Sequence, residues 1–169
     1  MERVRVHDFY SQALKGRRDF SHTKLVGKDK SLSLEKIYVL NNCFESDSRP
    51  LCLDSIRWSG VSLPKIKLPP KTSWSNARIW NSNFYGASML ENYLENPSFW
   101  NSYLLEVDFT GSTMVCPDFR FSNLADIVLT EVEGFNTAKL FGSKRGESKV
   151  AKFLHNLGLF RGIRIQRYG

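Results

Sequence analysis

Three histidines and three cysteines are the residues of this chain best suited to catalysis or metal binding. They are His7, His22, His155, Cys43, Cys52 and Cys116. The cysteines show neither a disulfide framework nor zinc-ligand spacing, and no histidine lies near a cysteine in the sequence. There is also no glycine-rich phosphate loop and no dinucleotide fingerprint. We therefore expect no enzymatic activity, no metal site and no cofactor, and we interpret the cysteines as free thiols.

Basic residues are concentrated at the C-terminal end. Residues 136–169 hold eight Lys/Arg and one acidic residue, whereas residues 51–135 hold six against nine, a balance of −3. The basic tail comprises Lys144, Arg145, Lys149, Lys152, Arg161, Arg164 and Arg167. Such a cluster neutralises phosphates when it binds nucleic acid, in a salt-dependent manner. The alternative is a solvated tail without a partner.

A strict repeat of five residues between 72 and 130 positions the outward side chains. A large apolar residue occupies the same place in twelve consecutive steps, and a small residue usually lies two positions earlier. The large residues are Trp74, Ile79, Phe84, Met89, Leu94, Phe99, Leu104, Phe109, Met114, Phe119, Leu124 and Leu129. Neither a helix nor a strand has a period of five. The pattern predicts a square coil in which the large and the small residue both point inward.

The repeat resembles the motif of the pentapeptide-repeat family: a small residue, Asp or Asn, Leu or Phe, and two variable positions. It reads Ser82-Asn83-Phe84, Ser122-Asn123-Leu124, Val107-Asp108-Phe109 and Pro117-Asp118-Phe119. Other side chains replace the Asp or Asn at Arg78, Ser88, Ser98 and Tyr103. The resemblance implies an all-β solenoid, a right-handed quadrilateral β-helix with four repeats per turn.

Shorter runs of the same period extend the predicted β-helix to residues 17–142, with 72–131 as its most regular part. We expect 23 repeats, with one residue added near 69–71 and another near 133–134, and a surface loop at 45–50. The further central residues are Phe20, Leu25, Leu34, Val39, Phe44, Leu53, Trp58, Leu63, Leu68, Phe135 and Leu140.

Each end of a solenoid needs a cap against solvent and other sheet edges. Residues 1–16 are the predicted N-terminal cap, in which Asp8 begins a short helix over 9–15 that Gly16 ends. Residues 143–169 are the predicted C-terminal cap and basic tail, with a helix beginning at Ser148. Its apolar stripe is Val150, Phe153, Leu154 and Leu157. Beyond it, a strand-like ending is either an edge for a homodimer, which the resemblance implies for members with a closing helix, or a frayed terminus.

Two outward columns carry the candidate binding residues. At a twenty-residue step, Trp80, Trp100 and Arg120 are predicted to stack on one wall. The next wall carries Tyr85, Tyr103 and Leu105. Arg and aromatic residues are enriched at interface hot spots, and Arg over Trp allows a cation–π contact. The two interpretations are a protein-binding patch and rings that pack along the coil wall.

These features favour a non-enzymatic scaffold that binds a protein of unknown identity. The resemblance implies two narrower roles, a DNA mimic that modulates DNA gyrase and a bacterial effector delivered to a host cell. The first requires a strongly acidic column, whereas the body here carries only −3. Because no secretory signal and no membrane span is visible, we expect a cytoplasmic chain, or one exported without a cleavable signal.

Overall fold

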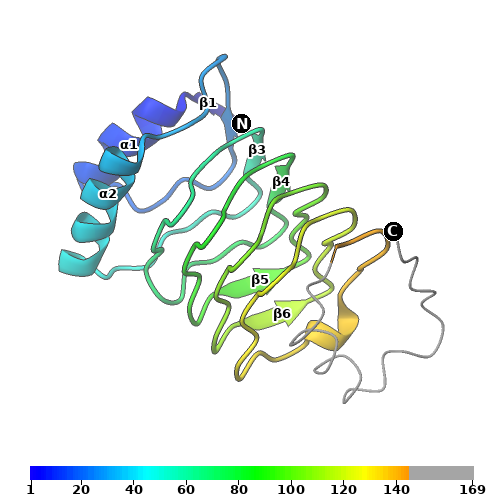
Figure 1. Cartoon of the computed structure of the whole chain (residues 1–169). Helices are drawn as coiled ribbons and strands as arrows, with labels where there is room; N and C mark the ends of the chain where they lie inside the picture. The colour runs from blue at the N-terminus through cyan, green and yellow to red at the C-terminus, as the bar shows by residue number, and fades with distance from the viewer. Residues whose placement is uncertain (145–169) are drawn as a thin grey trace.

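The computed structural model describes residues 1–144, which form a stack of square coils with two helices at one end (Figure 1). The predicted closing helix and strand-like ending lie outside the described residues. So do the basic residues Arg145, Lys149, Lys152, Arg161, Arg164 and Arg167.

The strands are short and pair only in parallel within residues 1–144. One sheet has the order β1-β2-β3-β4, a second pairs β5 with β6, and single parallel bridges join the coils on the remaining walls. The elements are β1 (Glu2–Val4), α1 (Val6–Leu14), β2 (Thr23–Leu25), α2 (Leu34–Ser46), β3 (Arg57–Ser59), β4 (Arg78–Trp80), β5 (Tyr93–Glu95), β6 (Thr113–Val115) and the 3-10 helix η1 (Phe135–Thr137).

The period of five corresponds to one side of the coil. All twelve central residues of the regular run are buried. The corners between sides lie in the left-handed backbone region, which recurs every five residues from position 76 to position 131. Gly and Asn adopt this region at the lowest cost. They occupy many of the corners, at Asn76, Asn81, Gly86, Asn96, Asn101 and Gly111.

The two one-residue insertions are confirmed by the register of the coils. Ser98 pairs with Asp118 at a step of twenty residues, whereas Arg57 pairs with Arg78, and Asp118 with Lys139, at a step of twenty-one. The second insertion contains Gly134, which has φ +75°, and a β-carbon there would collide with the backbone carbonyl of Met114. This close approach of two backbones explains the glycine.

Small inward residues connect one coil to the next through their hydroxyl groups. The Ser102 hydroxyl accepts a hydrogen bond from the Ser82 backbone N–H at 3.2 Å, and the Ser122 hydroxyl accepts one from Ser102 N–H at 3.0 Å. The Ser112 hydroxyl does the same for Asn92. Since a buried N–H without a partner is costly, the small residue is useful for its hydroxyl as well as for its size.

The repeats predicted at Leu34, Val39 and Phe44 are wrong, because residues 34–46 form helix α2. Leu34 is 62% exposed and Val39 40% exposed, whereas Phe44 is buried. The buried stripe of the helix is instead Ile37, Leu40, Asn41 and Phe44. Ser33 caps its N-terminus by accepting a hydrogen bond from Lys36 N–H. The helix also includes residues 45 and 46, which were expected in a loop.

Helix α1 begins earlier than expected. Arg5 is its N-cap, and Asp8 lies in the first turn, where its carboxylate accepts hydrogen bonds from the Arg5 backbone and side chain. Phe9 packs edge-on against Phe20 and Trp58, with ring centroids 4.7 and 5.0 Å apart. This helix therefore covers the apolar interior of the first coils.

Helix α2 lies beside α1 (Figure 1), and the side-chain amide of its Asn41 closes a strand edge. The Asn41 amide donates to Lys65 O at 3.0 Å, and its oxygen accepts from Lys67 N–H at 2.8 Å. These are the two bonds that a further parallel strand would make. Asn41 thus satisfies an edge that would otherwise be left open.

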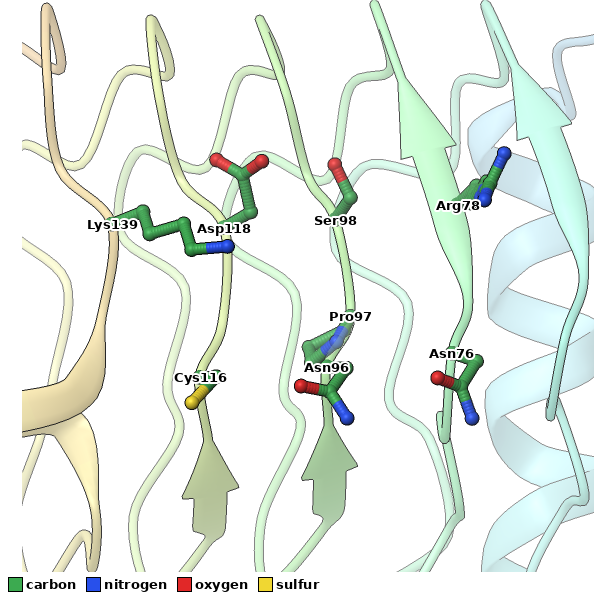
Figure 2. Close-up of a pocket in the computed structure, with 8 residues that line it drawn as sticks. All are labelled: Asn76, Arg78, Asn96, Pro97, Ser98, Cys116, Asp118 and Lys139. Carbon is green, nitrogen blue, oxygen red and sulfur yellow. The ribbon is translucent and has the colours of Figure 1, made fainter.

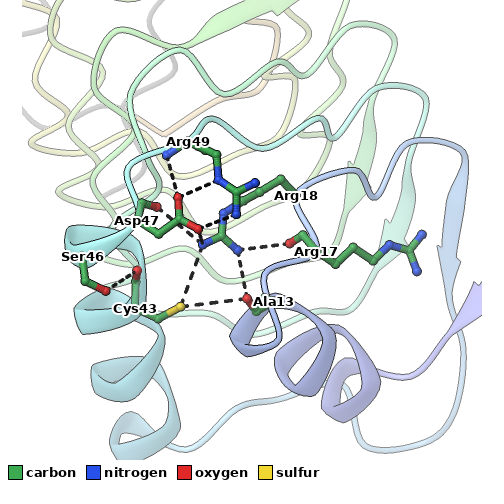
Figure 3. A network of polar contacts seen from close by, with 7 residues as sticks. All are labelled: Ala13, Arg17, Arg18, Cys43, Ser46, Asp47 and Arg49. Carbon is green, nitrogen blue, oxygen red and sulfur yellow. Dashed lines mark hydrogen bonds and ion pairs between the residues drawn. The ribbon is translucent and has the colours of Figure 1, made fainter.

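Arg18 joins both helices to the coil (Figure 3). Its side chain is only 10% exposed, and its guanidinium donates to Ala13 O at 2.9 Å and to the Asp47 carboxylate at 2.7 Å. Arg49 binds the same carboxylate at 2.7 Å. Hydrogen bonding from Arg49, together with the nearby charges of Arg18 and Arg49, holds the pKa of Asp47 far below its usual range. The nearly buried charge of Arg18 is therefore paired.

Candidate binding wall

One wall of the coil aligns five Lys and Arg residues in a single column. We call it the cationic wall and define it by the outward residues that pair in register, Arg3, Lys24, Arg57, Arg78, Ser98, Asp118 and Lys139. Its single acidic member, Asp118, is held by Arg120 through two bonds of 2.9 and 2.7 Å. Partial burial raises the pKa of Asp118, but the hydrogen bonds from Arg120 outweigh it, so that this pKa is lowered.

The wall that precedes it along the chain has the opposite sign. Its paired column contains Asp19 and Glu133, and the positions after the central residue add Asp54 and Glu95. No Lys or Arg occupies either column in residues 1–144. Charge is therefore sorted by wall, although the sequence segment that supplies most of both walls has a balance of only −3.

Exposed rings gather at the far end of the cationic wall. Trp80 and Trp100 are each 38% exposed, as expected for outward residues, and lie one coil apart. Trp100 meets Phe121 at 5.8 Å between ring centroids, and Phe121 meets Phe141 at 5.6 Å. We call Trp80, Trp100, Phe121 and Phe141 the aromatic patch.

Sequence reasoning missed Phe121 and Phe141, although they are 44% and 74% exposed. Phe121 occupies a left-handed corner with φ +61°, a position that rarely holds an aromatic residue. Phe141 follows the second insertion, which shifts the numbering of its column. A large apolar residue at a corner of the five-residue frame is the signal that identifies Phe121.

The remaining predicted site residues divide between two walls. Arg120 shares the wall of Trp80 and Trp100, but its guanidinium pairs with Asp118 rather than covering an indole. The nearest guanidinium to Trp80 is that of Arg78, at 5.9 Å from the ring centroid. The indole N–H of Trp80 donates to the Ser98 hydroxyl at 3.1 Å, which holds the ring along the wall.

The adjoining wall brings together the other candidates. The ring centroids of Tyr85 and Tyr103 lie 6.3 Å apart. Leu105, two residues after Tyr103, is half-buried. Hydrogen bonding to Glu106 raises the pKa of Tyr85. Lys144, the one described residue of the basic tail, pairs with Asn123 on this wall. Two small aromatic clusters therefore flank one corner of the coil.

A shallow polar pocket of about 300 Å³ opens on the cationic wall. Figure 2 shows Arg78, Ser98, Asp118 and Lys139 on successive coils, with Asn76 and Asn96 in a second row beside them. The rest of the lining is Pro97 and Cys116. Amide, hydroxyl and cationic groups dominate this surface. The pocket therefore offers hydrogen-bond donors and positive charge, without a paired nucleophile and base.

The described residues contain no group of three or more His, Cys, Asp or Glu side chains placed to hold a metal ion. Cys43 and Cys52 are half-buried and Cys116 is exposed, all as free thiols. Burial raises the pKa of the Cys52 thiol, which makes it a poor nucleophile. Between residues 1 and 144, neither helix is long and apolar enough to cross a membrane.

No protein-family model and no curated protein matches the sequence. The structure does match that of Rfr23, a pentapeptide repeat protein from the cyanobacterium Cyanothece 51142. The TM-score is 0.58 at 16% sequence identity, over 82% of this chain and 95% of that chain. The chain has the pentapeptide-repeat fold, a right-handed β-helix.

Two other pentapeptide-repeat structures superpose less well. HetL, involved in heterocyst differentiation regulation in Nostoc sp. strain PCC 7120, has a TM-score of 0.37 at 13% identity, covering 76% of this chain and 50% of its own. QnrB1, a plasmid-mediated fluoroquinolone resistance protein, has a TM-score of 0.39 at 14% identity, covering 83% and 81%. A shared fold does not determine function, which depends on the outward side chains of this chain.

Proposed function

We propose that this pentapeptide-repeat chain is a non-enzymatic scaffold that binds a protein partner through the aromatic patch and the adjoining tyrosines. The supporting observation is the exposed run of rings Trp100, Phe121 and Phe141 on a wall whose interior is fully packed. The core does not need these exposed rings, because it is already filled by other aromatic residues. Among them, Phe99 and Phe119 are buried and stack with their ring centroids 5.5 Å apart. Aromatic side chains on a rigid support are typical anchors of protein interfaces.

The site includes the residues expected from the sequence. Trp80 and Trp100 supply the flat rings, and Arg120 borders them with its charge balanced by Asp118. On the adjoining wall the contributors are Tyr85, Tyr103 and Leu105. A partner that covers this corner of the coil gains apolar burial from Trp100 and Phe121 without displacing any core residue.

A DNA-mimic role at gyrase has less support from the described surface. Such a role requires a continuous acidic column, and within residues 1–144 the acidic residues that follow one another at adjacent coils of a column are Glu106 and Asp126. The best-developed charged column has the opposite sign. We therefore favour protein binding through the aromatic patch over gyrase modulation. We also favour it over an effector role and over a homodimer formed at the C-terminal end.

The experiment is a quantitative pull-down with three immobilised proteins. These are the wild type, Trp100→Ala/Phe121→Ala in the patch, and Tyr93→Ala/Val115→Ala as the control, which removes two equally exposed apolar side chains from another wall. The proposal expects a protein that the wild type and the control retain and the patch variant loses. That protein, once purified, should rebind in calorimetry with the same ranking. Equal retention by all three, with their circular dichroism unchanged, refutes it.

A further inference from the structure

Four cations without an acidic partner in the described part of the chain lie side by side at the N-terminal end of the cationic wall. Arg3, Lys24, Arg57 and Arg78 are direct register partners on β1, β2, β3 and β4, and all four are exposed. We call them the cationic ladder. None of the ion pairs within residues 1–144 includes any of them.

This arrangement works against stability. Adjacent strands are about 4.8 Å apart, and like charges directly opposite each other on neighbouring strands are destabilising. No acidic residue of the same column balances these charges within residues 1–144. The nearest one, Asp118, is two coils beyond Arg78 and is bound to Arg120. An external anion that lies along the ladder would relieve this repulsion.

Its length and direction indicate an extended polyanion. Four cations at the strand spacing span about 14 Å along the rod. Phosphates in one strand of a duplex wind around the helix axis as they advance about 3.4 Å per nucleotide, whereas the ladder is straight. A single strand can unstack and follow a straight line, and its bases are then free to contact the wall, whereas the bases of a duplex are paired and stacked. The ladder therefore fits a single strand better than a duplex.

The surroundings of Arg78 add groups that suit bases. Trp80, exposed on the same strand two residues further on, presents an indole held along the wall by its bond to Ser98. Base stacking on such rings is the usual partner of phosphate contacts in single-strand binding. The polar pocket beside Arg78 contributes the amides of Asn76 and Asn96, which can hydrogen-bond to base edges (Figure 2). An acidic polypeptide without aromatic residues, such as poly-L-glutamate, would use the ladder but has no ring to stack on Trp80.

We propose that the N-terminal half of the cationic wall binds single-stranded nucleic acid. Phosphates lie along Arg3, Lys24, Arg57 and Arg78, and a base stacks on Trp80. This site goes beyond the protein-binding function, which uses the far end of the same wall, and the two adjoin at Trp80. It is also distinct from a basic tail, because its cations come from strands of the sheet.

The test measures the anisotropy of a fluorescein-labelled oligo(dT) of about 12 nucleotides, a length within the usual site size. The full-length chain is titrated between about 50 and 200 mM salt. Each phosphate neutralised on a single strand contributes about 0.7 to the slope of log Kd against log salt. Lys24→Gln/Arg57→Gln should reduce this slope by about 1.4 and weaken binding. The control Lys15→Gln/Lys65→Gln removes the same charge elsewhere and should leave the slope nearly unchanged.

Trp80→Leu separates a nucleic-acid site from a general anion site. It should weaken oligo(dT) binding about tenfold while the salt slope stays the same, because stacking involves no counter-ion. Equal slopes for the ladder variant and its control overturn the proposal and assign binding to other basic residues. Equal binding of a duplex also overturns it. So does displacement by poly-L-glutamate with no effect of Trp80→Leu, which indicates an acidic protein partner. If the chain still captures its protein partner but binds no oligonucleotide, the nucleic-acid proposal is refuted and the proposed protein-binding function is unaffected.

Discussion

The Asn41 amide provides the sharpest test of how α2 closes the solenoid. Asn41→Ala leaves two strand-edge groups, Lys65 O and Lys67 N–H, without their partners. A buried polar group that loses its hydrogen bond costs about 1–3 kcal/mol. Two such groups give a combined range of about 2–6 kcal/mol, and because Asn41 is 9% exposed we expect a cost near its lower end, about 2–3 kcal/mol.

Asn42→Ala is the matched control, since it makes the same chemical change one residue further along the helix at an exposed position. The gain in helix propensity is common to both variants and cancels in the comparison. Urea unfolding followed by circular dichroism gives the difference in unfolding free energy. For a chain of this size, a loss of about 2–3 kcal/mol in unfolding free energy corresponds to a decrease of about 5–10 °C in Tm.

Hydrogen exchange locates the effect. The Lys67 amide should exchange faster in Asn41→Ala and remain protected in Asn42→Ala, because only the first variant removes its acceptor. Coils beyond β5 should be unaffected, since each coil contacts mainly its neighbours. Equal destabilisation by both variants, or unchanged protection at Lys67, refutes the view that this amide takes the place of a missing strand.

Four further predictions concern other parts of the chain. Leu34→Ala should change the unfolding free energy by less than about 0.5 kcal/mol in urea unfolding, because Leu34 is exposed, and a large loss would favour the repeat interpretation. Phe109→Ala, in the packed interior, should cost about 3–5 kcal/mol in the same assay, and a cost below 1 kcal/mol contradicts the packing. Gly134→Ala should lower Tm strongly, because its β-carbon collides with the Met114 carbonyl, whereas Gly60→Ala, which meets no atom within 4 Å, isolates the cost of positive φ. Because the pKa of Asp47 is lowered in the folded state, its charge stabilises the fold above pH ~4, and this stabilisation is lost as the pH falls below that value. Unfolding measured across pH should therefore show that the difference in unfolding free energy between wild type and Asp47→Asn becomes smaller in acid.

The inward half of the fold was predictable because its periodicity is imposed by packing. Each side of the coil must bury one large residue, so the run from Trp74 to Leu129 repeats without a break. The insertions were predictable for the same reason, since Phe135 and Leu140 resume the frame and are buried.

Helix α2 was misread because two periods coincide within it. Leu34, Val39 and Phe44 satisfy a step of five, whereas Ile37, Leu40 and Phe44 satisfy the helical steps of three and four. Each pattern contains only three residues, so sequence periodicity alone cannot choose between them. The cap at Ser33 was the local signal that favoured the helix.

The outward site was only half predictable, since it depends on which residues the coils align. Trp80 and Trp100 follow from the regular step of twenty, whereas Phe121 and Phe141 lie at a corner and beyond an insertion. The partner of Arg120 depends on side-chain conformation. Asp118 two residues earlier offers a bidentate ion pair, which competes with the cation–π contact expected with tryptophan.

The cationic ladder shows why charge in a square coil has to be counted by wall rather than by sequence segment. Arg3, Lys24, Arg57 and Arg78 come from parts of the chain separated by two helices and an insertion, yet each lies one strand spacing from the next. The Debye length is about 8 Å at physiological salt. Charged residues that are neighbours on one wall therefore add to the same electrostatic potential, whereas charges across the coil contribute less to it. A body that is mildly acidic by segment can therefore present a strongly positive surface to one partner and a negative surface to another.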